Sequence, residues 1–318
     1  LIGAARPSIA DPYLPLKIEQ GRTNDIRECI GCNICTAGDN TNVPMRCTQN
    51  PTVGEEWRRG WHPERLKPLA TYPHLIIGSG PAGLEAARTL TKRGAEVTLA
   101  ETHEELGGRI TLESSLPGLA EWARVRDWRI SQLTDKPNAQ LFTRSTLTAD
   151  DILSYGIPNV ALATGAKWRT DGVGRTHKRS LQYLEATNVY SPDTLMKTGP
   201  SCLPQGPIAI FDDDTFYLGS VLAEQIASTG RKVLFITPSP IIAPYSDNTL
   251  EQGRIQLRLI DLGVKIIPLQ KLAGLSKATI TTACIYSDIK TKYDCRALIP
   301  ITMRLPNDPL WHDLHARK

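Results

Sequence analysis

The chain has 318 residues, of which 41% are hydrophobic and 22% are charged, and its formal net charge is +4 at pH 7. This length accommodates two globular units with cores of their own. Because Lys and Arg are scattered among Asp and Glu, the composition indicates no nucleic-acid-binding stripe. No apolar run is long enough for a membrane span and none resembles a secretory leader, so we expect a cytoplasmic protein without a membrane anchor.

The first 70 residues show little regular periodicity. The chain begins at Leu1 rather than Met, and residues 1–21 combine Pro-punctuated turns with little apolar mass. We interpret them as the end of a preceding domain of a longer polypeptide. Residues 22–70 contain four of the seven cysteines and then a stretch rich in Trp, Arg and Pro. We expect a metal to organise this segment, which should loosen without it.

Alternating strand and helix patterns begin at His74. The sequence predicts a buried strand at 74–78, a helix at 82–94 that ends at Gly94, and a strand at 95–101. Residues 118–134 repeat the helical period, and 159–165 form another buried strand that ends in a Gly turn. These elements predict a βαβ unit of the dinucleotide-binding type.

A second βαβ unit follows a segment rich in Ser, Pro, Gly and Thr at 181–205, where we place the boundary between the units. Its predicted elements are a strand at 207–211, a helix at 216–230, a strand at 231–237, two or three more strands, and then a final strand at 296–302 and a helix at 307–317. The expected fold class is α/β with two Rossmann-like domains of the disulfide-reductase type. The predicted domains are 71–200, completed by about 285–318, and 201–284.

The cysteines are unevenly placed. Cys29, Cys32 and Cys35 form a C-x2-C-x2-C run, and Cys47 follows on the same segment. Such runs supply three thiolates to an iron-sulfur cluster, which takes four, so the pattern predicts a 4Fe-4S cluster. A structural zinc also accepts four thiolates, although zinc ribbons usually offer two separated pairs. Free cysteines in a loop are the third alternative.

A glycine fingerprint lies between the first predicted strand and helix. Gly78, Gly80 and Gly83 have the G-x-G-x-x-G spacing, in which the glycines allow a tight turn, close approach to a pyrophosphate and close helix–strand packing. Glu101 ends the next strand, where a carboxylate can accept hydrogen bonds from ribose hydroxyls. The pair Gly107–Gly108 offers a second approach to the pyrophosphate.

The second unit lacks such a fingerprint. Its corresponding turn contains Asp212, Asp213 and Asp214, and no glycine occurs before Gly219. Three carboxylates would repel a pyrophosphate, so we expect this unit to bind no nicotinamide nucleotide.

These segments together resemble the C-terminal half of the trimethylamine, dimethylamine and histamine dehydrogenases. The similarity runs over essentially the whole chain and rests on the segments IGAARPSIADP, ECIGCNIC, CTQNPTVGEEWRRGWHPE, GSGPAGLEAAR, ELGG, LPGLAEW, ATGAKWRTDG and RLPNDPLWHDL. Members of that family are iron-sulfur flavoproteins with an N-terminal TIM barrel that holds FMN, a 4Fe-4S cluster, and ADP where related reductases hold FAD.

The resemblance implies a role for each segment. Residues 1–21 would be the last strand and loop of the FMN-binding barrel, with Arg6 on the FMN phosphate. The four clustered cysteines would ligate the 4Fe-4S cluster, and the Gly78 loop with Glu101 would hold ADP. The implied activity is oxidation of a small amine, with electrons passing from FMN through the cluster to a soluble electron-transfer flavoprotein or a similar carrier, in a homo-oligomer. Most of the barrel is absent from the sequence.

Two other functions remain open. A 2,4-dienoyl-CoA or enoate reductase would take electrons from NAD(P)H, although it needs a glycine fingerprint in the second unit and a Gly-Asp pair where this chain has Ile301–Arg304. A non-catalytic ferredoxin-like or nucleotide-binding module is the third hypothesis. The six histidines show no metal-ligand spacing, and we expect none to be catalytic. Three tryptophans and two arginines are further candidates for the electron route or cluster environment: Trp57, Trp61, Trp122, Arg58 and Arg59.

Overall fold

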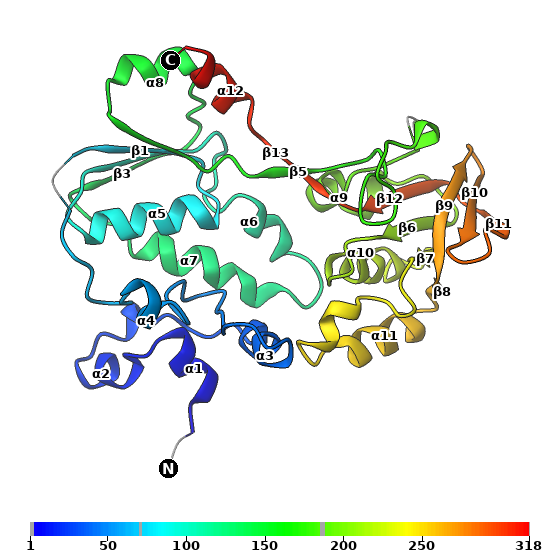
Figure 1. Cartoon of the computed structure of the whole chain (residues 1–318), viewed down its shortest axis with the longest axis horizontal. Coiled ribbons are helices and arrows are strands. Elements are labelled where there is room, and N and C mark those ends of the chain that lie inside the picture. The colour runs from blue at the N-terminus through cyan, green and yellow to red at the C-terminus, as the bar shows by residue number, and fades with distance from the viewer. Residues whose placement is uncertain (1–2, 70–71, 185–187, 318) are drawn as a thin grey trace. The chain divides into compact units, whose positions relative to one another are not determined.

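The computed structural model of the chain describes residues 3–69, 72–184 and 188–317. The chain folds into two compact units, and Figure 1 labels their helices and strands. Unit 1 comprises Leu1–Ser115, Leu119–Gly165 and Pro306–Lys318, and unit 2 comprises Leu116–Gly118 and Ala166–Leu305. Residues 185–187, within the predicted boundary, lie outside the described residues.

Unit 1 is built on a four-stranded parallel sheet of order β3-β2-β1-β4. Its strands are β1 (His74–Ile77), β2 (Val97–Ala100), β3 (Ala139–Phe142) and β4 (Asn159–Leu162). The helices of this unit's sheet region are α5 (Pro81–Lys92), α6 (Arg109–Glu113), η2 (Ala120–Trp122), α7 (Ala123–Ser131), α8 (Ala149–Tyr155) and α12 (Pro309–Ala316). The β1–α5–β2 unit predicted from the sequence is confirmed.

The two faces of this sheet carry different helices because successive strand side chains point to opposite sides. Ile76 and Leu99 pack with Leu84 of α5 and Leu133 beside α7. Leu75, Ile77 and Ala100 form a cluster with Ile152 of α8, and Leu310 and Leu314 of α12 pack against that cluster. Figure 1 shows α5 and α7 on one side of the sheet and α8 with α12 on the other.

Unit 2 contains a second parallel sheet, of order β12-β6-β7-β8. Its strands are β6 (Ile208–Asp212), β7 (Val233–Ile236), β8 (Lys265–Ile267) and β12 (Ala297–Ile301). Its helices are η3 (Gln182–Leu184), α9 (Pro192–Thr198), η4 (Pro200–Cys202), α10 (Leu218–Ala227), η5 (Pro244–Asp247) and α11 (Gln252–Asp261). The strands β6 and β7 are buried throughout, as expected of a parallel sheet covered on both faces.

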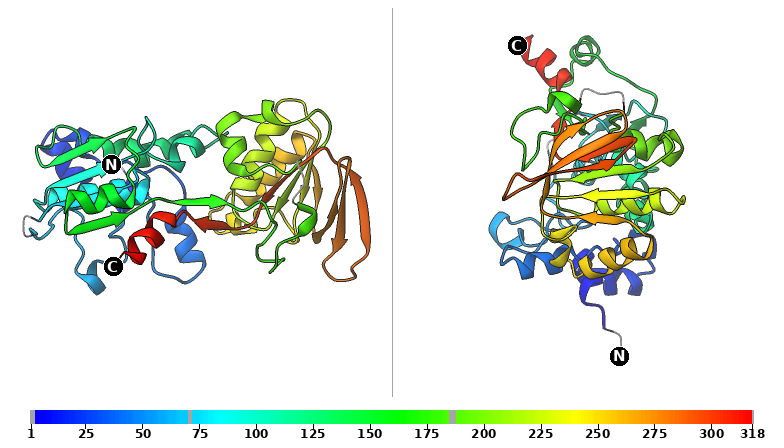
Figure 2. Two further views of the ribbon diagram at one scale, coloured as in Figure 1. Left: turned by 90° about the horizontal axis from the view of Figure 1, so that it is seen from above. Right: turned by 90° about the vertical axis from the view of Figure 1, so that its right-hand side faces the viewer.

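An antiparallel sheet extends unit 2. It consists of β9 (Gln270–Leu275), β10 (Thr279–Cys284) and β11 (Lys290–Asp294), and Figure 2 shows it in orange beside the parallel strands. The short strands β5 (Ala166–Trp168) and β13 (Arg304–Pro306) form a two-stranded sheet.

The predicted domain boundaries differ from those of the structure. The segment 181–205 does not separate the units, because α9 packs against β12 and β5 within unit 2. Residues 285–305 also belong to unit 2, since β12 pairs in parallel with β6, and only the segment with α12 joins unit 1. Local composition marked a Pro-rich connection, whereas strand pairing decides which unit a segment joins.

The N-terminal part of unit 1 is made of short helices. They are α1 (Ala5–Ala10), α2 (Leu14–Glu19), η1 (Thr23–Asp25), α3 (Ile34–Asn40) and α4 (Glu56–Arg59). The expectation of a strand within residues 1–21 is therefore wrong for its described part, because α1 and α2 cover most of it. Pro15 is tolerated because it lies in the first turn of α2, where its missing N–H leaves no helical bond unmade. Within the described ranges, no helix combines the length and apolar character that crossing a membrane requires.

Candidate functional site

The four clustered cysteines come together in unit 1. Cys29, Cys32, Cys35 and Cys47 are all half-buried and line one cavity. The cavity also contacts Arg6, Ile9, Ile30, Asn33 and Gln49. The spacing predicted this convergence, because a two-residue spacer turns the chain so that successive sulfurs face one point.

Hydrogen bonds and apolar contacts fix the cysteine loop. Gly31, whose φ of +70° suits glycine, donates its backbone N–H to the Cys29 Sγ at 3.4 Å. The Cys32 Sγ lies 3.2 Å from the Thr48 hydroxyl. Ile30 is buried in a cluster with Ile110 of α6 and Val125 of α7. The loop therefore presents its sulfurs from a backbone that packing holds in place.

The surroundings of Cys47 favour its neutral thiol form over the thiolate. Burial raises the pKa of Cys47, and the neighbouring Cys32 and Cys29 add to that rise. A bound metal reverses this effect, because its charge stabilises the thiolate form. Among the described side chains, no group of three His, Cys, Asp or Glu is placed to hold one metal ion.

Two buried arginines hold the ends of the cysteine loop. Arg129 of α7, which is 3% exposed, donates to the Gln49 carbonyl oxygen at 3.0 Å and to the Gln49 Oε1 at 3.1 Å. The Arg27 guanidinium donates to the Asn50 Oδ1 at 3.2 Å and lies 4.2 Å above the Trp128 ring. No local pattern indicates these roles, because each arginine bonds to a residue of a distant segment.

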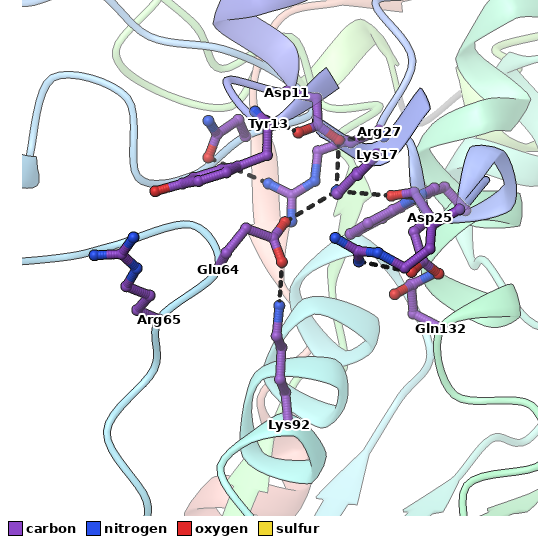
Figure 3. Close-up of polar contacts among 12 residues, drawn as sticks. Asp11, Tyr13, Lys17, Asp25, Arg27, Glu64, Arg65, Lys92 and Gln132 are labelled. Carbon is purple, nitrogen blue, oxygen red and sulfur yellow. Dashed lines mark hydrogen bonds and ion pairs between the residues drawn. The ribbon is translucent and has the colours of Figure 1, made fainter. Parts of the chain in front are cut away.

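A chain of charges connects α2 to α5 within unit 1 (Figure 3). The Lys17 Nζ, 2% exposed, lies 2.7 Å from Asp11 and 3.0 Å from Glu64, and the Lys92 Nζ of α5 lies 2.6 Å from the other oxygen of Glu64. Asp11 also accepts the backbone N–H of Arg27 at 2.9 Å. The start of the cysteine segment is thus bonded to α2 and, through Glu64, to α5.

The glycine fingerprint adopts the predicted turn between β1 and α5. A Cβ on Gly83 would lie 1.9 Å from the Gly78 carbonyl oxygen, and one on Gly78 would lie 2.5 Å from the Ala163 carbonyl oxygen. These two glycines are therefore required for packing. A Cβ on Gly80 meets no atom within 4 Å. The space beside Gly80 is where a ligand can approach the helix N-terminus.

Glu101 stands beside this turn, as the sequence predicted, but its oxygens already have partners. Its Oε2 accepts the backbone N–H of Ser79 at 2.9 Å and the Ser79 hydroxyl at 2.7 Å. Its Oε1 accepts the backbone N–H of His103 at 2.9 Å and lies 2.8 Å from the His103 Nδ1. Burial opposes ionisation, yet these hydrogen bonds hold the pKa of Glu101 below its usual value. A ribose would have to replace one of these donors.

The second glycine pair contacts the first turn directly. Gly107 donates its backbone N–H to the Ser79 carbonyl oxygen at 3.0 Å, and its φ is +118°. A Cβ on Gly108 would lie 3.2 Å from the Gly80 Cα. Gly108 therefore lies beside Gly80, and Gly107 is bonded to the neighbouring Ser79.

The acidic turn of unit 2 is filled by its own side chains. Asp212, at the end of β6, accepts the backbone N–H groups of Asp214 and Thr215 at 3.2 Å each. Asp213, 2% exposed, accepts the backbone N–H and the hydroxyl of Thr176 at 2.8 and 2.7 Å. Amide groups that could face a phosphate are thus bonded to carboxylates.

The remaining candidates have other surroundings. The Arg6 guanidinium donates to the Asn33 Oδ1 beside the cysteine cavity. Arg58 and Arg59 both pair with Glu55. Three further side chains differ in exposure: Trp57 is 84% exposed, Trp61 is 45% exposed under Arg59, and Trp122 packs with the cluster around Ile30. The histidines His62, His74, His103, His177, His312 and His315 join no metal-binding group within the described ranges.

Comparison with known proteins identifies a matching domain family and related enzymes. A family profile described as an NAD(P)-binding Rossmann-like domain matches residues 76–142. The chain is 38% identical to the dimethylamine dehydrogenase of Hyphomicrobium sp. (strain x) over 345 aligned residues, which cover 100% of the chain and 46% of that protein.

Solved structures agree with this match. The histamine dehydrogenase from Rhizobium sp. 4-9 superposes with a TM-score of 0.96 at 45% identity, and the 6-hydroxypseudooxynicotine amine oxidase from Pseudomonas geniculata N1 superposes with 0.97 at 40% identity. Each alignment covers 100% of the chain and 49% or 48% of the relative. The chain therefore belongs to the family of the dimethylamine and histamine dehydrogenases and spans about half the length of these relatives.

Proposed function

We propose that the chain is the electron-transfer portion of an iron-sulfur flavoprotein amine dehydrogenase. The convergence of Cys29, Cys32, Cys35 and Cys47 on one cavity carries this proposal. A 4Fe-4S cluster bound there supplies a site that takes up and releases single electrons. Because the described thiols are not yet arranged to hold a metal ion, their side chains would change rotamer when the cluster binds.

The residues around the cysteines have defined tasks in this proposal. The four thiolates hold the irons, and the Gly31 N–H on the Cys29 sulfur orients that ligand. The apolar packing of Ile30 keeps water from one side of the loop. The two-residue spacing and the lack of a second separated pair favour a cluster over zinc.

The Gly78 loop is proposed to hold ADP as a structural ligand. Gly80 leaves room for the pyrophosphate at the N-terminus of α5, and Gly107 and Gly108 flank it. Glu101 is proposed to reach the ribose by exchanging its bond to the His103 side chain for one to a hydroxyl. ADP has no redox chemistry, so it would stabilise unit 1 without changing oxidation state.

The remaining partners belong to the whole protein. FMN is proposed to be bound mostly outside the present sequence, with Arg6 at its phosphate, and residues 1–21 would be the end of that FMN-binding barrel. The full protein is proposed to oxidise a small amine, to pass electrons to a soluble electron-transfer flavoprotein or similar carrier, and to form a homo-oligomer.

Anaerobic purification of the full-length protein tests the cluster. We expect iron and acid-labile sulfide in equal amounts, and an electron paramagnetic resonance signal after reduction with dithionite. Cys35→Ser should lower the iron content, whereas Cys202→Ser, a half-buried cysteine of unit 2, should not. Zinc in place of iron, or equal effects of the two substitutions, would contradict the proposal.

Anaerobic mixing then tests the reaction. A methylated amine or histamine should bleach the flavin of the full-length protein, and NADPH should not. The opposite result would support the NAD(P)H-dependent enoate reductase. Protein that contains the cluster but no flavin would support the non-catalytic module.

A further inference from the structure

Three buried arginines of unit 1 lie around a single carboxylate, that of Glu85. Arg27, Arg88 and Arg129 are 4%, 6% and 3% exposed, and Glu85 is the carboxylate that pairs with two of them. The distances to Glu85 are 2.6 Å from the Arg88 Nη2 and 2.8 Å from the Arg129 Nε. The surrounding arginines hold the pKa of Glu85 below its usual value although burial opposes this.

The nearby acid Asp11 does not balance the excess. Its carboxylate is paired at 2.7 Å with the ammonium of Lys17, which is as buried as Asp11 itself. Arg27 instead lies over the Trp128 ring and bonds to the neutral Asn50. Two of the three guanidiniums pair with Glu85, and Arg27 lies near that carboxylate without an ion pair to it. Burying unpaired charge costs several kcal/mol, so a compensating anion is expected close by.

The arginines are attached to both ends of the loop that carries the thiols. Arg129 bonds to the main chain and side chain of Gln49, two residues after Cys47. Arg27 lies two residues before Cys29. Four thiolates give a 4Fe-4S cluster a net negative charge, which grows by one unit when an electron enters. The cysteine cavity is therefore the place where the missing anion would lie.

We propose that Arg129 raises the reduction potential of the cluster by supplying buried positive charge beside Cys47, and that Glu85 opposes this effect. The inference rests on the proposed cluster. One electron from an external reductant enters the cluster, and the fixed charge of Arg129 lowers the free energy of the more negative, reduced form. The low dielectric of the site strengthens this interaction relative to water.

Opposite charge changes at the same site separate this electrostatic effect from a merely structural one. Arg129→Gln removes the charge, Arg129→Lys keeps it while losing the forked bonds to Gln49, and Glu85→Gln removes the opposing charge. Lys136→Gln is the matched control, because Lys136 is exposed on the same unit. A structural role alone would move the first two variants together and would not reverse with the third.

The measurement is a dithionite titration of the anaerobic full-length protein with redox mediators, followed by electron paramagnetic resonance, with iron content determined for every variant. At the wild-type midpoint potential, we expect Arg129→Gln to lower the ratio of reduced to oxidised cluster about tenfold, or ~59 mV for a one-electron couple. Glu85→Gln should raise the ratio. Arg129→Lys and Lys136→Gln should stay within about threefold of the wild type.

Each outcome bears on a different claim. Iron-loaded Arg129→Gln with an unchanged ratio, or a shift of Arg129→Gln and Glu85→Gln in the same direction, would overturn the inference and leave the cluster intact. If Arg129→Gln fails to retain iron, Glu85→Gln tests the inference alone. A higher ratio of reduced to oxidised cluster in that variant supports the inference, and an unchanged or lower ratio overturns it. A wild-type protein without iron would instead overturn the proposed function.

Discussion

Asp212 is a buried carboxyl group that loses its proton less readily in the folded chain than in water. It is fully buried at the end of β6, and burial together with the charge of Asp214 raises its pKa to about 8. Its Oδ2 has no hydrogen-bond partner among the described atoms. The folded chain therefore retains a proton on Asp212 at pH values where the unfolded chain has released it.

This difference in protonation predicts how stability depends on pH. Because the pKa in the folded state lies above the unfolded value of about 3.9, the contribution of Asp212 is complete below pH 4 and is lost as the pH rises toward 8. Asp212→Asn should therefore raise the free energy of unfolding by roughly 2–5 kcal/mol at pH 8, and by much less at pH 5. Chemical denaturation across this range measures it. A gain that does not change with pH would contradict the prediction.

The glycines of the β1–α5 turn predict two separable effects. Gly80→Ala places its Cβ in open space, so the free energy of unfolding should change by less than about 0.5 kcal/mol while ADP affinity falls at least about tenfold. Gly83→Ala forces its Cβ against the Gly78 carbonyl oxygen and should destabilise unit 1 by roughly 1–3 kcal/mol. Calorimetric titration with ADP and thermal unfolding test the pair. Equal losses of stability would show that Gly80 is also required for packing.

Residues with local signals were predictable, and residues with distant partners were not. The cysteine spacing and the G-x-G-x-x-G motif each lie within a few turns of chain, so their geometry follows from the sequence. Arg129 and Gln49, or Lys17 and Glu64, meet only after folding, and nothing in their neighbourhoods marks them. The hydrogen bonds that occupy Glu101 could likewise not be predicted from the sequence, because two of the donors belong to Ser79 on another loop.

The helices and strands whose apolar residues repeat at regular spacing were predicted correctly. β1, α5 and β2 follow from a buried apolar run, a helical stripe and a closing glycine. The helices α1 and α2 were missed because their prolines suggested turns, although a proline in a first turn does not break a helix. Residues 285–305, which include β12, were assigned to the wrong unit, since strand order within a sheet is a property of tertiary packing.

The attachment of α2 to the rest of unit 1 predicts a large effect of one lysine. Lys17→Met leaves the buried Asp11 carboxylate without its cationic partner and should lower the free energy of unfolding by roughly 3–5 kcal/mol. Lys92→Met removes the partly exposed end of the same chain of charges and should cost about 1 kcal/mol or less. Denaturant unfolding of both variants measures the difference. Similar losses would mean that Asp11 gains another partner in the variant.

Metal removal should affect the two units differently. The cysteine segment contains only short helices, whereas unit 2 has a buried parallel sheet. After iron is chelated, amide hydrogen exchange should rise at least about tenfold in residues 26–50, while β6 and β7 keep their protection. Mass-spectrometric exchange of the loaded and chelated protein tests this expectation. A parallel increase in both units would show that the cluster stabilises the entire chain.

In the turn after β6, aspartate side chains of the chain itself accept the backbone N–H groups. Asp212 and Asp213 occupy backbone donors in the way a phosphate group would, so this unit already contains its own intramolecular mimic of a ligand. Grafting glycines into the turn would leave the backbone N–H groups of Thr215 and Thr176 without their carboxylate partners. Converting this unit into a coenzyme-binding module would require exchanging both aspartates and the loop around Thr176 in a single step.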